Sequence, residues 1–263
     1  MKILLVNDDG IDSLGLKILA EQISPLGDIY IFAPEKHQSA MSQALTIRKK
    51  IQVKDYGTLY GSQRAFSAKG TPADCTRLAL FIYNNINFDL VISGINRGAN
   101  LGSDVLHSGT VGAASEAASL GINAVAVSSP YKDFTMAEKY LKNIVKYLIE
   151  KKIVSSEYIL NVNFPSEIFN EPKGVMFSVQ GENKYRPAFI RKSFNKYVAT
   201  YNKYDLKEKE NSDVYCYKNG IISITPIFED RSRKSYSEKF NTLNSEQLNR
   251  FLKYGKINGE GDR

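Results

Sequence analysis

Residues 2–10 of the chain read KILLVNDDG. Four consecutive apolar residues leave no polar face for a surface helix, a pattern typical of a parallel strand buried on both faces. The strand runs directly into two carboxylates, Asp8 and Asp9, and a glycine. In an open α/β sheet, ligands bind beyond the carboxyl ends of the strands. Because the alternation of side chains lapses where a strand turns, both carboxylates can reach one cation. A solvated Asp-Gly turn is the alternative interpretation.

Strand-like and helix-like segments alternate along the first 165 residues, which predicts an α/β fold. The segments typical of buried strands are 2–6, 28–32, 88–92, 123–127 and 158–163. The segments typical of helices are 16–23, a helix beginning at Pro72 with Thr71 as its N-cap, 111–120 and 137–148. Met41 to Ser67 is predicted to be irregular or a hairpin. We therefore expect residues 1–170 to form the catalytic core.

The chain changes character beyond about residue 170. Residues 182–210 are rich in Lys, Asn, Tyr and Glu and show no clear period. The runs 214–217 and 221–225, separated by a Lys-Asn-Gly turn, predict a hairpin, and residues 243–254 predict a short final helix. We expect residues 171–263 to be a C-terminal extension of hairpin and helix that serves dimerisation.

Composition sets the outer limits. The chain has 263 residues, and its two cysteines, Cys75 and Cys216, lack metal-ligand or redox spacing, which favours a reducing cytoplasmic location. No apolar run suggests a signal peptide or a membrane span. The net charge of +7 arises entirely in residues 131–263, which contain 24 Lys and Arg against 17 Asp and Glu. This basic half could attract anionic substrates or nucleic acid, although solvated surface lysines are the commoner explanation of such a charge.

Oxygen donors gather in the loops that follow the predicted strands. The loops supply Asp8, Asp9, Ser39 and Asn96, the last within a glycine-rich stretch at 93–102 that lets backbone approach a ligand. Only two histidines exist, so a histidine-rich zinc site is disfavoured. Carboxylate, hydroxyl and amide oxygens favour a hard divalent cation such as Mg²⁺, Mn²⁺ or Ca²⁺.

A second candidate site lies at Ser108, Gly109 and Thr110, where a helix is predicted to begin. The free N–H groups and the positive dipole end of a helix start bind anions. The alternative is that Ser108 or Thr110 only caps the helix. A phosphate-binding helix start beside a hard cation indicates phosphoryl chemistry.

Five motifs in this order resemble the survival protein SurE family of nucleotidases. They are NDDG at 7–10, PEKHQSA at 34–40, GTPADC at 70–75, SGINRGAN at 93–100 and SGTV at 108–111. The resemblance covers residues 1–165 and returns weakly at 223–226.

The resemblance implies a Rossmann-like core, a mostly parallel sheet flanked by helices, and metal-dependent 5′/3′-nucleotidase activity. It implies one divalent cation per subunit, Mg²⁺ or Mn²⁺, bound by Asp8, Asp9, Ser39 and Asn96, with Asp8, Asp9 and Asn96 serving catalysis. Ser108, Gly109 and Thr110 would hold the phosphate of a nucleoside monophosphate, and short RNA or polyphosphate are further possible substrates. It also implies a homodimer or larger homo-oligomer with exchanged C-terminal segments.

Three classes of function remain open at this stage. The first is a phosphomonoesterase in which the metal activates a water. The second is a phosphatase in which Asp8 is a covalent nucleophile, although an Asp-x-Asp spacing would be expected there. The third is a non-catalytic nucleotide or RNA binder that uses the basic C-terminal half and leaves the paired aspartates without a role.

Overall fold

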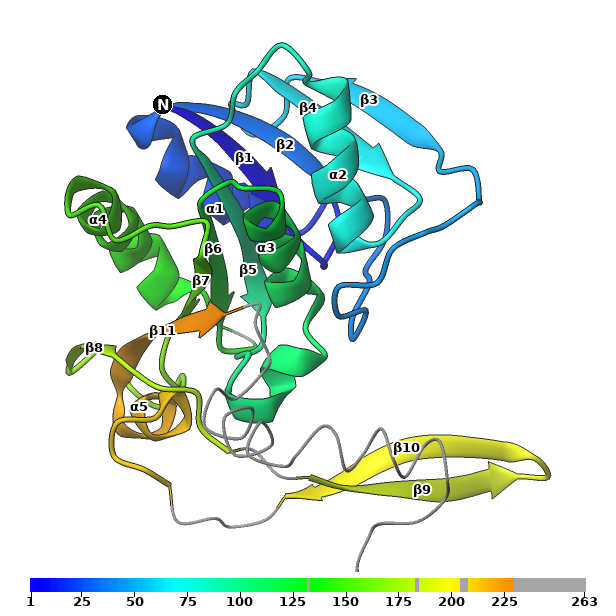
Figure 1. Cartoon of the computed structure of the whole chain (residues 1–263). Coiled ribbons are helices and arrows are strands. Elements are labelled where there is room, and N and C mark those ends of the chain that lie inside the picture. The colour runs from blue at the N-terminus through cyan, green and yellow to red at the C-terminus, as the bar shows by residue number, and fades with distance from the viewer. Residues whose placement is uncertain (132, 183–184, 204–207, 229–263) are drawn as a thin grey trace, which may run out of the picture. The chain divides into compact units, whose positions relative to one another are not determined.

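A computed structural model describes residues 1–131, 133–182, 185–203 and 208–228. Its centre is a nine-stranded sheet with helices on both faces (Figure 1). The strands in spatial order are β3 (Val53–Gly57), β4 (Arg64–Ala68), β2 (Asp28–Pro34), β1 (Lys2–Val6), β5 (Leu90–Arg97), β6 (Ala124–Ser129), β7 (Tyr158–Asn163), β11 (Ile221–Phe228) and β8 (Gly174–Phe177). β1 pairs in parallel with both β2 and β5, and β3 pairs antiparallel with β4. The predicted α/β fold with a mostly parallel sheet is confirmed.

The structure describes seven helices, two of which are short 3-10 helices. They are α1 (Leu14–Ile23), η1 (Ser24–Leu26), α2 (Pro72–Ile82), η2 (Gly102–Leu106), α3 (Gly109–Ser119), α4 (Thr135–Glu150) and α5 (Asp213–Asn219). Ile3 and Leu5 of β1 pack in one core with α1 and α4, whereas Leu4 and Val6 pack in a second core with α2 and α3. Because both faces of the sheet are covered, all four side chains are fully buried. Replacing Ile3, Leu4 or Leu5 with Ala would lower the free energy of unfolding by about 2–5 kcal/mol.

The predicted start of α2 is confirmed in detail. Thr71 Oγ1 accepts from Asp74 N at 3.0 Å, and the Asp74 carboxylate accepts from Thr71 N at 2.9 Å, which forms a capping box. Asp74 also accepts from the backbone and hydroxyl of Thr46 at 2.9 and 2.6 Å. The capping residues of α2 therefore also anchor the loop that follows β2.

The predicted hairpin at 214–225 is wrong, because its first half is helix α5. Val214, Tyr215, Cys216 and Tyr217 resemble a strand in sequence. The residues on either side of them, however, cap the two ends of a helix. Ser212 Oγ accepts from the N–H of Tyr215 at 3.1 Å, and Gly220 ends the helix with a φ of 81°. The second half of the predicted hairpin lies in β11, which pairs in parallel with β8.

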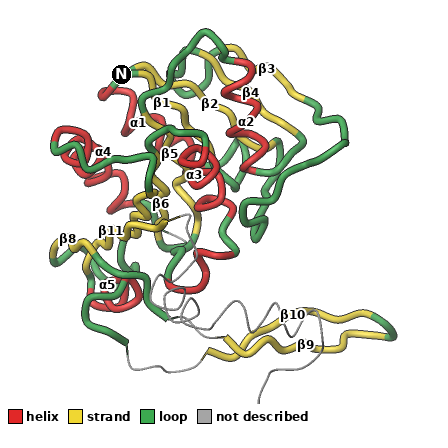
Figure 2. The backbone as a smooth tube through the Cα atoms, viewed as in Figure 1, coloured by secondary structure: helices red, strands yellow, loops and turns green. Residues whose placement is uncertain are grey.

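The described residues beyond 170 are more regular than their composition indicates. β8 and β11 continue the main sheet, so the sheet is not confined to residues 1–170. The division into a catalytic core and a C-terminal extension at residue 170 stays a prediction. Within 182–210, β9 (Tyr185–Ser193) and β10 (Lys196–Lys203) form a separate antiparallel pair (Figure 2). The predicted helix at 243–254 lies outside the described residues. No helix in the described ranges has the length and apolar character to cross a membrane.

Candidate active site

The turn after β1 presents the two aspartates. Asn7 Nδ2 donates to Gly10 O at 2.9 Å and to Ser13 Oγ at 2.7 Å, and Gly10 N donates back to Asn7 Oδ1 at 3.2 Å. Gly10 has a φ of 103°, a conformation that favours glycine. The buried Asn7 side chain therefore closes the turn and fixes the backbone that carries Asp8 and Asp9.

Asp8 is joined to the start of α3. Its side chain is 4% exposed, and Oδ1 accepts from the hydroxyl of Thr110, itself fully buried, at 2.5 Å. Burial raises the pKa of Asp8 to about 6, the charge of Asp9 adds to the rise, and the hydrogen bond from Thr110 opposes it. The two predicted sites are thus in direct contact.

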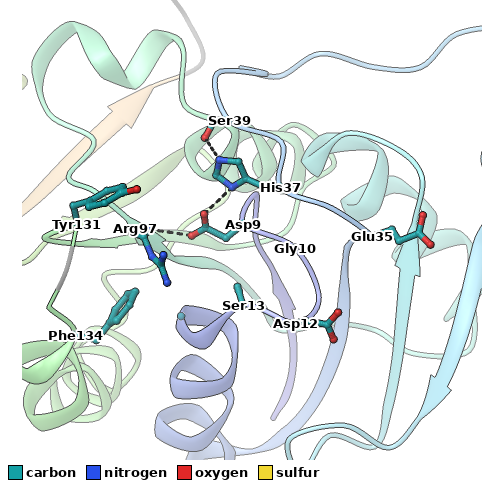
Figure 3. A pocket seen from close by; sticks show the side chains of 11 residues that line it. Asp9, Gly10, Asp12, Ser13, Glu35, His37, Ser39, Arg97, Tyr131 and Phe134 are labelled. Atoms are coloured by element: carbon teal, nitrogen blue, oxygen red, sulfur yellow. Dashed lines mark hydrogen bonds and ion pairs between the residues drawn. The ribbon is translucent and has the colours of Figure 1, made fainter.

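Asp9 lies at the centre of a second set of contacts (Figure 3). Its Oδ1 is 3.0 Å from His37 Nδ1, and its Oδ2 accepts from the backbone N–H of Arg97 at 3.1 Å. The other ring nitrogen of His37, Nε2, is 2.5 Å from Ser39 Oγ. The imidazole therefore connects two of the predicted metal ligands.

Asn96, the fourth predicted ligand, lies on β5. Its Nδ2 donates to Gly98 O at 2.7 Å, which leaves Oδ1 as the atom that a cation could take. The predicted ligands thus come from the turn after β1, the loop after β2, and β5. β2 and β5 flank β1 in the sheet, so the segments that carry the four residues are neighbours, although Asn96 itself contacts Gly98.

The start of α3 is capped and has backbone N–H groups that favour negative charge. Ser108 Oγ accepts from Val111 N at 3.1 Å, as the capping interpretation expects. The N–H groups of the first helical turn have no intrahelical acceptor and favour negative charge. At Gly109, a Cβ would lie 2.9 Å from Asp8 Cβ. Glycine is therefore required for the close approach of helix and carboxylate.

A pocket of about 460 Å³ opens beside Asp9 (Figure 3). Its lining residues are Asp9, Gly10, Asp12, Ser13, Gly15, Glu35, His37, Ser39, Arg97, Tyr131 and Phe134. The sequence interpretation did not single out His37, Arg97 or Tyr131 as functional. All three line the pocket only because segments that are far apart in the sequence meet in the fold. No local sequence pattern shows this.

The chain is similar to known proteins in sequence. The sequence profile described as "Survival protein SurE" matches residues 3–187. The chain belongs to the SurE family. It is 36% identical over 251 residues to a 5′-nucleotidase SurE of Clostridium botulinum, which covers 92% of this chain and 99% of the relative. It is 37% identical over 253 residues to the 5′-nucleotidase SurE of Thermoanaerobacter sp. X514, with 93% and 98% covered.

The fold is also that of a solved SurE structure. The crystal structure of SurE from Aquifex aeolicus superposes with a TM-score of 0.79 at 30% identity. The match covers 92% of this chain and 99% of that one. The resemblance seen in the five sequence motifs therefore extends over nearly the whole SurE chain.

The donor atoms of this SurE site fit a hard divalent cation. Asp8 and Asp9 are adjacent carboxylates, and the repulsion between them contributes to the raised pKa of Asp8. A cation between them would relieve that repulsion. Within the described part of the chain, no cluster of three or more His, Cys, Asp and Glu side chains forms a metal site. The neutral oxygens of Ser39 and Asn96 would complete the protein's contribution.

The raised pKa of Asp8 predicts a stability gain on neutralisation. The folded protein binds the Asp8 proton more tightly than the unfolded chain, so Asp8 favours folding below about pH 4 and opposes it increasingly as pH rises through 6. In chelator, Asp8→Asn should match wild type near pH 4. At pH 8 it should be more stable by up to about 3 kcal/mol. Denaturant unfolding at both pH values measures this, and a less stable variant at pH 8 would contradict it.

Proposed function

We propose that this SurE family member is a divalent-cation-dependent phosphomonoesterase that converts nucleoside 5′- and 3′-monophosphates to nucleoside and phosphate. The observation that carries the proposal is the 2.5 Å hydrogen bond between Thr110 and Asp8. It joins the helix start that we propose for the phosphate to the carboxylate pair that we propose for the cation. The names of the Clostridium and Thermoanaerobacter relatives support nucleotidase activity.

The residues divide into two roles. Asp8, Asp9, Ser39 and Asn96 would hold one Mg²⁺ or Mn²⁺, and the helix start at 108–110 would hold the phosphate. When bound, the cation supplies Lewis-acid polarisation of the phosphoryl group and a water of lowered pKa. The backbone N–H groups of α3 stabilise negative charge that develops on the phosphoryl oxygens. The pocket beside Asp9 would hold the nucleoside part of the substrate.

A panel of phosphate esters tests the activity. Phosphate release from AMP and GMP, as 5′ and 3′ isomers, should require Mg²⁺ or Mn²⁺ and stop in excess chelator. We expect bis(p-nitrophenyl) phosphate to be a poor substrate, because a diester has one fewer terminal oxygen to share between the cation and the helix start. Full turnover in chelator, or diester cleavage as fast as monoester cleavage, would contradict the proposal. Short RNA and polyphosphate in the same panel define the range of substrates.

We also propose that the protein works as a homo-oligomer in the cytoplasm. Cys75 and Cys216 are buried free thiols, which fits a reducing compartment. Among the described residues no third strand pairs with β9 or β10. An isolated two-stranded hairpin is marginal in water. Several large apolar side chains on it are exposed, namely Phe189, Ile190, Phe194, Tyr197 and Val198. A second copy of the chain could cover them.

Replacing two of these side chains tests the oligomer. Phe189→Ser together with Val198→Ser should convert the full-length protein from dimer or larger to monomer, measured by light scattering. Ile168→Ser is the matched control, because Ile168 is 75% exposed but lies outside the β9–β10 pair. A monodisperse wild-type monomer would contradict the proposal directly.

A further inference from the structure

We infer that Asn163 is a positioning residue for the proposed reaction, because its side-chain amide fixes the loop that follows Asn96 and that orients Asp9. The inference rests on the proposed function, since it assigns Asn163 a part in the same site. Asn163 is the last residue of β7 and is 1% exposed. β6 separates its strand from β5, which carries Asn96 (Figure 1). Its effect on the site is therefore indirect, through the loop.

The loop after β5 is anchored at Asn100. The N–H of Asn100 donates to Asn163 Oδ1 at 2.8 Å, and its carbonyl accepts from Asn163 Nδ2 at 3.2 Å. The same carbonyl accepts from Asn161 Nδ2 at 2.9 Å. The side chain of Asn100 donates to Ser128 Oγ at 2.9 Å. All four residues are buried, and an unpaired polar backbone group would be costly there. These contacts therefore define one position for Asn100.

The hydrogen bonds to Asn100 require an amide at position 163. The pairing of β6 with β7 ends at Ser128 and Asn163, and Asn100 lies past the end of β5. The Asn163 amide offers an acceptor and a donor on one group, so it pairs with the backbone of Asn100 as a neighbouring strand would. Aspartate would keep only the acceptor, and leucine would keep neither.

The anchored loop contacts the proposed cation site at two points. The N–H of Arg97 donates to Asp9 Oδ2 at 3.1 Å. The carbonyl of Gly98 accepts from Asn96 Nδ2 at 2.7 Å, which also directs Oδ1 of the same amide. Arg97 and Gly98 lie between the end of the sheet pairing and the anchor at Asn100. The orientation of Asn96 and Asp9 therefore depends on where the anchor holds the loop.

Both ends of the loop have further contacts. Gly98 N donates to Ser129 O at 2.9 Å, and Gly102 N donates to Asp213 Oδ2 at 2.9 Å. Replacing Asn163 therefore releases the middle of the loop, while its two ends stay attached to the fold. A displacement of about 1 Å at a catalytic group can cost about 10²-fold in rate. Loss of the anchor should thus affect turnover more than folding.

Asn163→Leu in the full-length protein tests the inference, because leucine removes both hydrogen bonds to Asn100. At saturating Mn²⁺ we expect kcat for AMP to fall about 10–100-fold. KM should change less than about threefold, because the proposed phosphate site at the start of α3 is unchanged. Steady-state phosphate release measures both constants. Circular dichroism and denaturant unfolding verify that the variant is folded in the assay.

Tyr83→Phe is the matched control for lost buried hydrogen bonds. The hydroxyl of buried Tyr83 donates to the carbonyls of Ile31 and Arg64, at 3.2 and 3.1 Å. These carbonyls belong to β2 and β4, on the other side of β1 from the loop after β5. Phenylalanine removes the bonds with little change of shape. It should lower the unfolding midpoint, as Asn163→Leu does, and leave kcat within about twofold of wild type.

Asn163→Asp adds a readout in pH. The introduced carboxylate would face the carbonyl of Asn100 without a donor, so burial and this carbonyl should raise its pKa above the usual range. Once protonated, the carboxyl can donate to the carbonyl as the amide does. The kcat of this variant relative to wild type should therefore be highest near about pH 5 and fall as the pH rises to about 8.

The outcomes separate this inference from the proposed function. A folded Asn163→Leu variant with the kcat of wild type would overturn the role of Asn163 and leave the phosphomonoesterase intact. An equal loss of kcat in Tyr83→Phe would also overturn it, because general destabilisation would then explain the loss. If Asn163→Leu does not fold, a kcat ratio of Asn163→Asp that is independent of pH overturns the inference. Wild type that releases no phosphate from nucleoside monophosphates would overturn the proposed function itself.

Discussion

Asp9→Asn should lower nucleotidase turnover by about a thousandfold while the protein stays folded. Asp9 lies where the β1 turn, His37 and the backbone of Arg97 converge. The amide keeps the shape of the side chain but loses the charge that we propose holds the cation. Metal polarisation of a phosphoryl group is worth several kcal/mol, and about 4 kcal/mol corresponds to roughly a thousandfold in rate. Steady-state phosphate release at saturating Mn²⁺ measures the loss.

Asp12→Asn is the matched control for this change. Asp12 lines the same pocket and is exposed, but it is not among the predicted ligands. Its replacement removes one negative charge nearby and should change turnover by less than tenfold, because an exposed charge is screened by solvent. Equal losses in the two variants would mean that the pocket needs negative charge in general. Such a result would remove the specific role of Asp9.

Thr110→Val should lower turnover by about 10–100-fold, because the lost hydrogen bond to a charged group is worth about 1.5–3 kcal/mol. The sequence predicted Thr110 as a phosphate ligand, but its hydroxyl hydrogen is directed to Asp8 in the structure. The valine variant leaves a buried carboxylate without that donor, so the pKa of Asp8 should rise further. We therefore expect weaker cation binding and an acid limb of the pH–rate profile shifted to higher pH.

Thr110→Ser separates the hydroxyl from the shape of the side chain. Serine keeps the donor to Asp8 and should retain most of the turnover and the cation affinity, whereas valine keeps the volume and loses both. Calorimetry with Mn²⁺ and a pH–rate profile on AMP measure the two effects. If valine and serine behave alike, the hydroxyl is dispensable and the anion is held by backbone N–H groups alone.

The parts of the site that the sequence predicts are those governed by local rules. The apolar run 3–6 identifies a buried strand, and parallel sheets place ligands at strand ends. Asp8, Asp9 and Asn96 follow from that rule without knowledge of the sheet order. The cap of α2 follows from the spacing of Thr71, Pro72 and Asp74.

The parts that the sequence does not predict depend on tertiary contacts or on competing local signals. His37 reaches Asp9 only because the loop after β2 crosses the β1 turn. In α5, the strand-like alternation is overridden by a capping serine and a C-terminal glycine around seven residues. Asp213 at its first position accepts from the backbone N–H groups of Gly102 and Gly181. Those contacts tie the short helix to distant segments.

The hydrogen bonds that assemble the site join residues far apart along the chain. Asp9 and Arg97 are 88 residues apart, and Asp8 and Thr110 are 102 apart. Contacts of such long sequence separation form slowly, because closing a long loop costs conformational entropy before the contact itself stabilises the chain. Catalytic competence is therefore a late event in folding: helical structure can return early after dilution from denaturant, but turnover returns only when β1, β5 and α3 have come together.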